Sequence, residues 1–163
     1  MELFNPVQPL VPNILRVIKY EYDTHAFYRL ANNWAANKGY DIAAAYFAKD
    51  AAEEIGHAVA WQDFLNQWGC EYELPEMKSE EEFESLPDIV RKAYELMVVI
   101  YKAYSALATE SYLVDKSVWT KAMEYVDIQT GAVAYWRTKV DQLGLIDESN
   151  KLDVLYYEQK AFA

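Results

Sequence analysis

The sequence predicts an all-α fold, an up-down four-helix bundle with one long crossover between its second and third helices. Three observations support this prediction. Apolar residues recur at close to a 3.6-residue period in four long stretches, which is the pattern of amphipathic helices. Five glycines and five prolines among 163 residues are too few for a turn-rich β architecture. One connection between the periodic stretches is much longer than the others, as in bundles with a crossover.

The helix boundaries follow from punctuating residues. Gly39 and Gly144 come where the first and fourth periodic stretches end, as C-terminal caps do. Pro87 falls in the first turn of the third, a position that proline favours. A single domain, 1–163, is expected, with helices at about 13–38, 41–68, 86–114 and 117–143 and a tail, 147–163, that has room for a short fifth helix.

The connection between the second and third helices covers about residues 70–84. Fully extended, it could reach about 50 Å, which exceeds the length of about 40 Å expected for each long helix. It can therefore carry the chain back along the bundle, so that the second and third helices run parallel. A capping-box pattern of Ser79 and Glu82 predicts one helical turn within it.

The charge balance excludes several classes of partner. Fifteen Lys and Arg against 26 Asp and Glu give a formal net charge of -11, which argues against nucleic acid and against an anionic membrane surface. Cys70 is the single cysteine, so an internal disulfide and a cysteine-based metal cluster are excluded. The start of the chain lacks a basic segment typical of signal peptides, and no apolar run reaches transmembrane length. We expect an acidic, soluble, cytoplasmic protein.

Two glutamates lie on the apolar faces of their predicted helices, Glu21 on the first and Glu54 on the second. An unpaired carboxylate in a core is costly, so each must be protonated, paired or bound to a metal. The only two histidines lie one turn away, His25 after Glu21 and His57 after Glu54. One inward glutamate is commonly a local hydrogen-bonding feature, but two with adjacent histidines indicate a metal site. Carboxylate and imidazole ligands suit iron, manganese or zinc.

These motifs give the sequence a resemblance to a known family. The stretch Phe47–Ala58 contains Glu-Glu-x-x-His-Ala, Tyr28 follows Glu21 by seven residues, and Gln129 lies in the fourth helix. In this pattern the chain resembles the bacterial non-haem ferritins over about residues 14–143.

The resemblance implies a ferritin-like bundle in which Glu54 bridges two irons and His57 binds one of them. It also implies that Tyr28 lies near the metals, where an outer-shell or redox role is its candidate function, and that Gln129 lies beside them. Ferritins close into 24-subunit shells that store iron, so the implied partners are iron ions and further copies of this chain.

The departures from the family pattern concern the second metal. Met97 occupies the position of the family's third-helix glutamate, and Glu95 projects about 160° away from it. Residues 130–132, where bacterial ferritins often have acidic side chains, are Thr, Gly and Ala. We therefore expect one well-held metal at Glu21, Glu54 and His57 and a weak or absent second one. Additional candidate ligands are Glu53, His25 and Gln129.

Two functional interpretations follow. In the first, the protein is a ferritin-like iron-binding protein for iron storage and oxidation, with a degraded second site and weak ferroxidase activity. In the alternative, it is a ferritin-fold subunit without ferroxidase activity, acting in a structural or partner-binding shell. That subunit would be metal-free or would hold a single structural metal, with zinc or manganese in place of iron.

Overall fold

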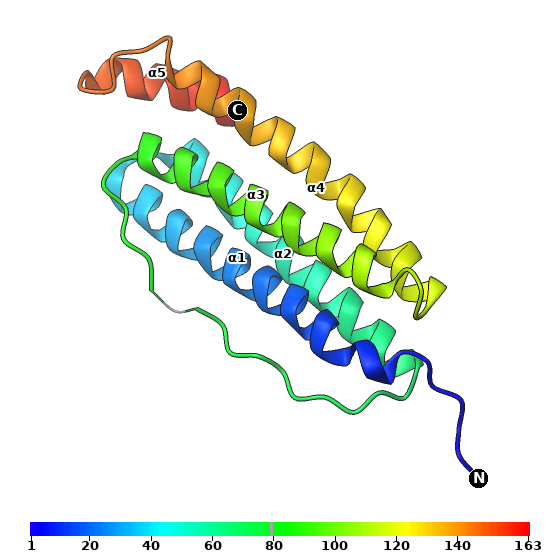
Figure 1. The fold of residues 1–163 in the computed structure, drawn as a ribbon. Coiled ribbons are helices and arrows are strands. Elements are labelled where there is room, and N and C mark those ends of the chain that lie inside the picture. Colours follow the sequence, from blue (N-terminus) through cyan, green and yellow to red (C-terminus); the bar gives the residue numbers. More distant parts are fainter. Residues whose placement is uncertain (79) are drawn as a thin grey trace.

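The structure, a computed structural model, describes residues 1–78 and 80–163, and these residues form helices and connections without a strand. Four long helices form the bundle and a shorter fifth helix follows them (Figure 1), which confirms the predicted fold class. The elements are η1 (Gln8–Leu10), α1 (Val11–Lys38), α2 (Asp41–Gln67), α3 (Leu86–Ser111), α4 (Lys116–Leu143) and α5 (Lys151–Phe162). Compared with the expected bounds, α1 starts earlier, at Val11, and α3 ends earlier, at Ser111.

Local chemistry sets the helix ends. Gly39 ends α1 in the left-handed conformation, with φ 83°, which costs glycine little because it has no Cβ. The Ser85 hydroxyl accepts a hydrogen bond from the Asp88 amide at the start of α3. The Asp115 carboxylate accepts one from the Val118 amide at the start of α4. Each cap satisfies a backbone donor that the first helical turn leaves free.

The long connection, residues 68–85, carries the chain back along the outside of the bundle beside α1 (Figure 1). As a result α2 and α3 run parallel, while α1 packs against α2 and α3 against α4 as antiparallel pairs. This arrangement places α1, α2, α3 and α4 around one interior, so side chains from all four helices can meet there.

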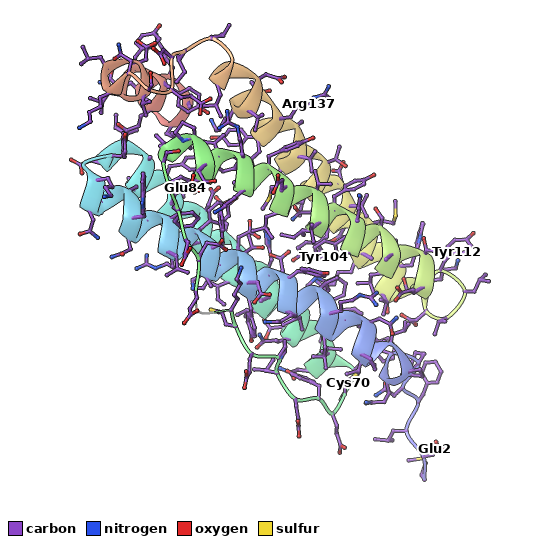
Figure 2. The ribbon with its side chains drawn as sticks, turned by 60° about the vertical axis from the view of Figure 1, so that its left-hand side comes forward. Glu2, Cys70, Glu84, Tyr104, Tyr112 and Arg137 are labelled. Carbon is purple, nitrogen blue, oxygen red and sulfur yellow. The ribbon has the colours of Figure 1, made fainter. Side chains whose placement is uncertain are left out.

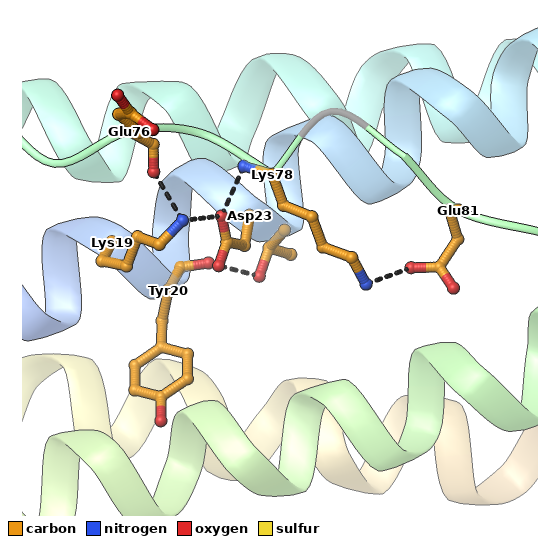
Figure 3. A network of polar contacts seen from close by, with 7 residues as sticks. Lys19, Tyr20, Asp23, Glu76, Lys78 and Glu81 are labelled. Atoms are coloured by element: carbon orange, nitrogen blue, oxygen red, sulfur yellow. Dashed lines mark hydrogen bonds and ion pairs between the residues drawn. The ribbon is translucent and has the colours of Figure 1, made fainter.

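A polar network attaches this connection to α1 (Figure 3). The Lys19 ammonium lies 2.8 Å from the Asp23 carboxylate and donates to the Glu76 carbonyl at 2.5 Å. The same Asp23 carboxylate accepts from the backbone amide of Lys78 at 2.8 Å. Lys78 in turn forms an ion pair with Glu81 at 3.0 Å. The side chains of Lys19 and Asp23 on α1 therefore hold the backbone of the crossover.

Two local predictions concern the crossover and the inner face of α3. The helical turn predicted from Ser79 and Glu82 begins at a residue outside the described part of the chain, and residues 80–83, which are described, are not helical. The sequence pattern of the third helix predicts Tyr101 on the inner face, together with Met97 and Tyr104. It is instead 37% exposed, because its position on α3 turns it out of the bundle, whereas Tyr104 is fully buried.

The interior is rich in large aromatic side chains, but it also contains buried polar groups. Glu21, Glu54 and Gln129 are at most 8% exposed and lie on α1, α2 and α4. Burying such polar groups is costly unless they have partners. Their surroundings are therefore the candidate functional site. Within the described residues, no helix combines the length and the apolarity needed to cross a membrane.

Candidate metal centre

Glu21 of α1 and the pair Glu54 and His57 of α2 meet inside the bundle. Glu54 and His57 are separated by about one helical turn and therefore lie on the same face of α2. Each of the three residues offers a ligand atom, and these atoms all lie within 4.8 Å of one another. The His57 Nδ1 is 3.3 Å from Glu21 Oε2 and 3.5 Å from Glu54 Oε2. The structure thus brings together the three residues that the sequence analysis placed around the first metal.

These atoms have no hydrogen-bond partners of their own among the described residues. Glu21 Oε2, Glu54 Oε2 and His57 Nδ1 are buried and unpartnered. Two carboxylate oxygens and an imidazole nitrogen that converge in this way fit a divalent transition metal such as iron, manganese or zinc. A bound cation would satisfy all three, because each atom can donate a lone pair to it.

The third helix contributes a hydrogen-bond donor to this group. The Tyr104 hydroxyl of α3 donates to Glu21 Oε1 at 2.8 Å and accepts from Trp61 Nε1 at 3.1 Å. Figure 2 labels Tyr104 on α3, within the bundle. This chain of two hydrogen bonds holds one oxygen of Glu21 and leaves the other directed toward His57. Tyr104 is not among the site residues selected from the sequence; its position two turns after Met97 on the inner face was the available signal.

The metal-free cluster retains protons. Burial disfavours the imidazolium, but the adjacent carboxylates of Glu21 and Glu54 favour it more strongly and raise the pKa of His57 to about 10. Burial and the neighbouring Glu21 carboxylate raise the pKa of Glu54 to about 8, although His57 opposes this shift. The two groups titrate together, so protonated His57 acts as an internal counter-charge for the carboxylates at neutral pH.

These shifts predict opposite pH dependences for the metal-free and metal-bound protein. The folded-state pKa of His57 lies above 6.5 and that of Glu54 above 4.5. The folded state therefore binds more protons than the unfolded state, and its stability falls as the pH rises toward the folded-state pKa values. A metal needs deprotonated ligands, so the melting-temperature increase produced by Zn(II) should grow from about pH 6 to about pH 8.5. Thermal unfolding with and without Zn(II) measures this increase in melting temperature. An increase that stays constant or becomes smaller as the pH rises would contradict this assignment of protons.

The other predicted ligands lie around this group at different distances. His25 stays outside it, because its Nδ1 is 2.6 Å from the Ala51 carbonyl oxygen of α2. Glu53 is exposed and is not part of this group. Gln129 is buried, and its Oε1 has no hydrogen-bond partner in the described part of the chain.

Tyr28 and Met97 lie together beside the cluster. The Tyr28 hydroxyl is 4.0 Å from the Met97 sulfur, and both side chains are about 1% exposed. Burial and the charges of Glu54 and Asp50 raise the pKa of Tyr28 well above its usual value, so it remains a neutral phenol. Met97 thus packs against Tyr28, and Glu95 is exposed as expected. Neither residue provides a carboxylate from α3 to the cluster.

A cavity of about 290 Å³ lies next to Glu54. Its lining includes Glu53, Met97 and Gln129, together with Asp50, a residue that the sequence analysis did not select. Burial and repulsion from Glu53 and Glu54 raise the pKa of Asp50 to about 7, although a hydrogen bond with Tyr46 opposes this rise. Its position one turn before Glu54 on the same helix was the signal that could have identified it.

The fold is that of known ferritins. The chain superposes on a novel open pore ferritin from the hyperthermophilic archaeon Archaeoglobus fulgidus with a TM-score of 0.87, at 21% identity and 94% coverage of each chain. A humanized archaeal ferritin gives a TM-score of 0.86 at 22% identity, covering 94% of this chain and 95% of that one. No family model matches the sequence.

Sequence similarity narrows the assignment. A bacterial non-heme ferritin of Campylobacter jejuni subsp. jejuni is 33% identical over 124 residues, which is 74% of each protein. The chain therefore belongs to the non-haem ferritin family, and the resemblance seen in its motifs is confirmed.

Proposed function

We propose that this protein is a ferritin that binds iron for storage and holds its first metal ion between Glu21, Glu54 and His57. The observation that carries the proposal is the convergence of three buried, unpartnered ligand atoms from α1 and α2. Membership of the ferritin family supports iron as the metal. A cytosolic location, expected from the sequence, belongs to the same proposal.

The side chains around the cluster have distinct roles in this proposal. Bound Fe(II) would supply one electron to an oxidant such as oxygen and become Fe(III). Glu54 has one oxygen near His57 and also lines the adjacent cavity, so it can serve two metal ions. His57 releases its proton to solvent when iron binds. Tyr104 fixes the orientation of Glu21, and Tyr28 remains a neutral donor close to the second position.

The second metal position is weaker than the first because α3 presents Met97 to it. A thioether carries no charge, so it cannot compensate a divalent cation in a site of low dielectric constant. A pair of irons can pass two electrons to oxygen together, and a weakly held second iron limits this step. We therefore expect slow ferroxidase activity.

The competing function is a ferritin-fold subunit without ferroxidase activity that holds one structural metal, zinc or manganese, or none. The position of Met97 favours it, because α3 presents a neutral thioether beside Tyr28 where a further ligand would be needed. Rapid oxygen-dependent oxidation of Fe(II) by the purified protein would exclude this alternative.

Anaerobic titration with Fe(II) tests the leading proposal. We expect one tightly bound Fe(II) per chain and a second that binds more weakly, measured by calorimetry. Two equally tight ions would contradict the weak second position, and the absence of any tight ion would contradict the iron site itself.

Assembly into a homo-oligomer is part of the proposal, with a 24-subunit shell as the form that the family suggests. Exposed apolar side chains at the turn between α3 and α4 support it, because such clusters commonly mark interfaces. They are Tyr112, Leu113 and Val114, with Met123 nearby on α4. Light scattering during size-exclusion chromatography should give a mass many times the 18.9 kDa of one chain; a monomer would contradict the shell.

A further inference from the structure

The cavity next to Glu54 is a second space, separate from the one between Glu21 and His57. Glu54 and His57 line it, whereas Glu21 is not among the lining residues that the structure describes. Along α2 it extends toward the N-terminal end of the helix, where Asp50 is the next acidic residue on the same face. The cavity of about 290 Å³ has room for a cation with several bound waters.

Small residues of α4 keep this space open. Gly131 and Ala132 line the cavity opposite α2. At Gly131 no heavy atom lies within 4 Å of the position that a Cβ would take. The absence of acidic side chains at these positions therefore leaves room beside Asp50.

One buried oxygen on this cavity needs a partner. Gln129 is 1% exposed, and in the described chain its Oε1 has no hydrogen-bond partner, whereas Glu54 Oε2 is the oxygen near His57. Lys139, whose ammonium lies over the Tyr135 ring that lines the cavity, donates to the Ala161 carbonyl. Buried acceptor oxygens without donors are rare in folded proteins, and a cation would satisfy Gln129 Oε1.

We propose that Asp50 is a ligand of the second divalent cation and supplies the carboxylate that α3 lacks. In this arrangement Glu54 bridges the two cations, and Gln129 Oε1 coordinates the second with Asp50. One turn along α2 separates the two carboxylates by about 5–6 Å at Cβ, which suits two metals that lie about 3.5–4 Å apart. The inference rests on the proposed function, because it requires the first metal at Glu21, Glu54 and His57.

Charge supports this assignment. Glu21 and Glu54 alone would face two divalent cations with two negative charges. Asp50 adds a third within the same interior, which reduces the excess positive charge where the dielectric constant is low. Among the described residues Asp50 forms no ion pair with Lys or Arg, and Tyr46, the side chain in contact with it, is neutral.

Anaerobic calorimetry and visible absorption with Co(II) test the assignment on the full chain. The wild-type protein should bind one tight and one weaker Co(II). Asp50→Asn should keep the tight ion at wild-type affinity, while the weaker one loses affinity by at least about tenfold. The matched control is Asp63→Asn, which removes a charge from the exposed surface of the same helix, away from the cavity lining, and should leave both ions bound.

A second variant separates ligand loss from misfolding. Adding Met97→Glu to Asp50→Asn places a carboxylate on the opposite wall of the cavity and should restore the second Co(II). Melting temperatures of the metal-free variants monitor folding.

The outcomes separate this inference from the proposed function. If Asp50→Asn binds both ions as tightly as wild type, or if its only effect is a lower melting temperature, Asp50 is no ligand and the first site stands. A wild-type protein that binds only the tight ion overturns the inference as well. If the wild-type protein binds no tight ion, the proposed function fails and the inference with it.

Discussion

Replacing Glu54 by glutamine should remove both metal ions from the protein. The Glu54 carboxylate lies 3.5 Å from His57 and also lines the adjacent cavity, so in the proposed arrangement it is the ligand that the two metal positions share. A neutral amide oxygen is a weaker ligand for a divalent cation. Substitutions in the second shell of metal sites already cost about 10–100-fold in affinity, so loss of this direct ligand should cost the first ion more than about 100-fold.

The same substitution should leave the metal-free fold intact. In Glu54→Gln, His57 keeps its ion pair with Glu21 at 3.3 Å, and the repulsion between two buried carboxylates disappears. The melting temperature without metal should therefore be equal to or higher than that of wild type. Asp63→Asn is the exposed control on the same helix and should bind the first ion normally. Calorimetry with Co(II) measures the change; a first ion bound by Glu54→Gln within about tenfold of wild type would remove Glu54 from the site.

Together, the two variants on α2 distinguish a bridging ligand from a terminal one. A bridging ligand serves both ions, so Glu54→Gln should affect both. A terminal ligand serves one, so Asp50→Asn should affect the second ion alone. The two residues lie on one face of the same helix, one turn apart, and therefore differ mainly in their distance from His57.

The convergence of Glu21, Glu54 and His57 was predictable because its geometry is largely local. Glu54 and His57 lie on one helix at a spacing that fixes their relative positions, whatever the tertiary structure. Glu21 required only one further assumption, that the first two helices form an antiparallel pair. The fold class was accessible for the same reason, since periodicity and connection lengths are read along the chain.

The remaining features of the site depend on how the helices are rotated against each other. The sequence spacing of His25 suggested a ligand, but the packing of α1 on α2 brings its Nδ1 to the Ala51 carbonyl instead. Asp50 lines a cavity because the small residues Gly131 and Ala132 of α4 leave space beside it, and the pattern of α2 alone does not indicate this space. Tyr104 meets Glu21 across 83 positions of sequence, a contact that no pattern within one helix indicates.

Replacing Tyr104 by phenylalanine should weaken the first metal site without removing any ligand. The Tyr104 hydroxyl donates to Glu21 Oε1 at 2.8 Å and accepts from Trp61 Nε1 at 3.1 Å, and all three side chains are fully buried. Without it, a buried acceptor and a buried donor both lose their partner, at a cost of about 1–3 kcal/mol for each group. For a chain of this size, each kcal/mol lowers the melting temperature by about 2–4 °C.

Metal affinity should fall in Tyr104→Phe because Glu21 is then free to turn its carboxylate away from His57. Loss of such a positioning hydrogen bond typically costs about 10–100-fold in metal affinity. The matched control is Tyr101→Phe, on the same helix, where the side chain is 37% exposed; it should change neither the melting temperature nor Co(II) binding. If Tyr104→Phe behaves like that control, Glu21 is held by packing alone. If affinity and stability both fall, α3 contributes to the metal site through a hydrogen bond to Glu21, even though it presents Met97 where a ligand would lie.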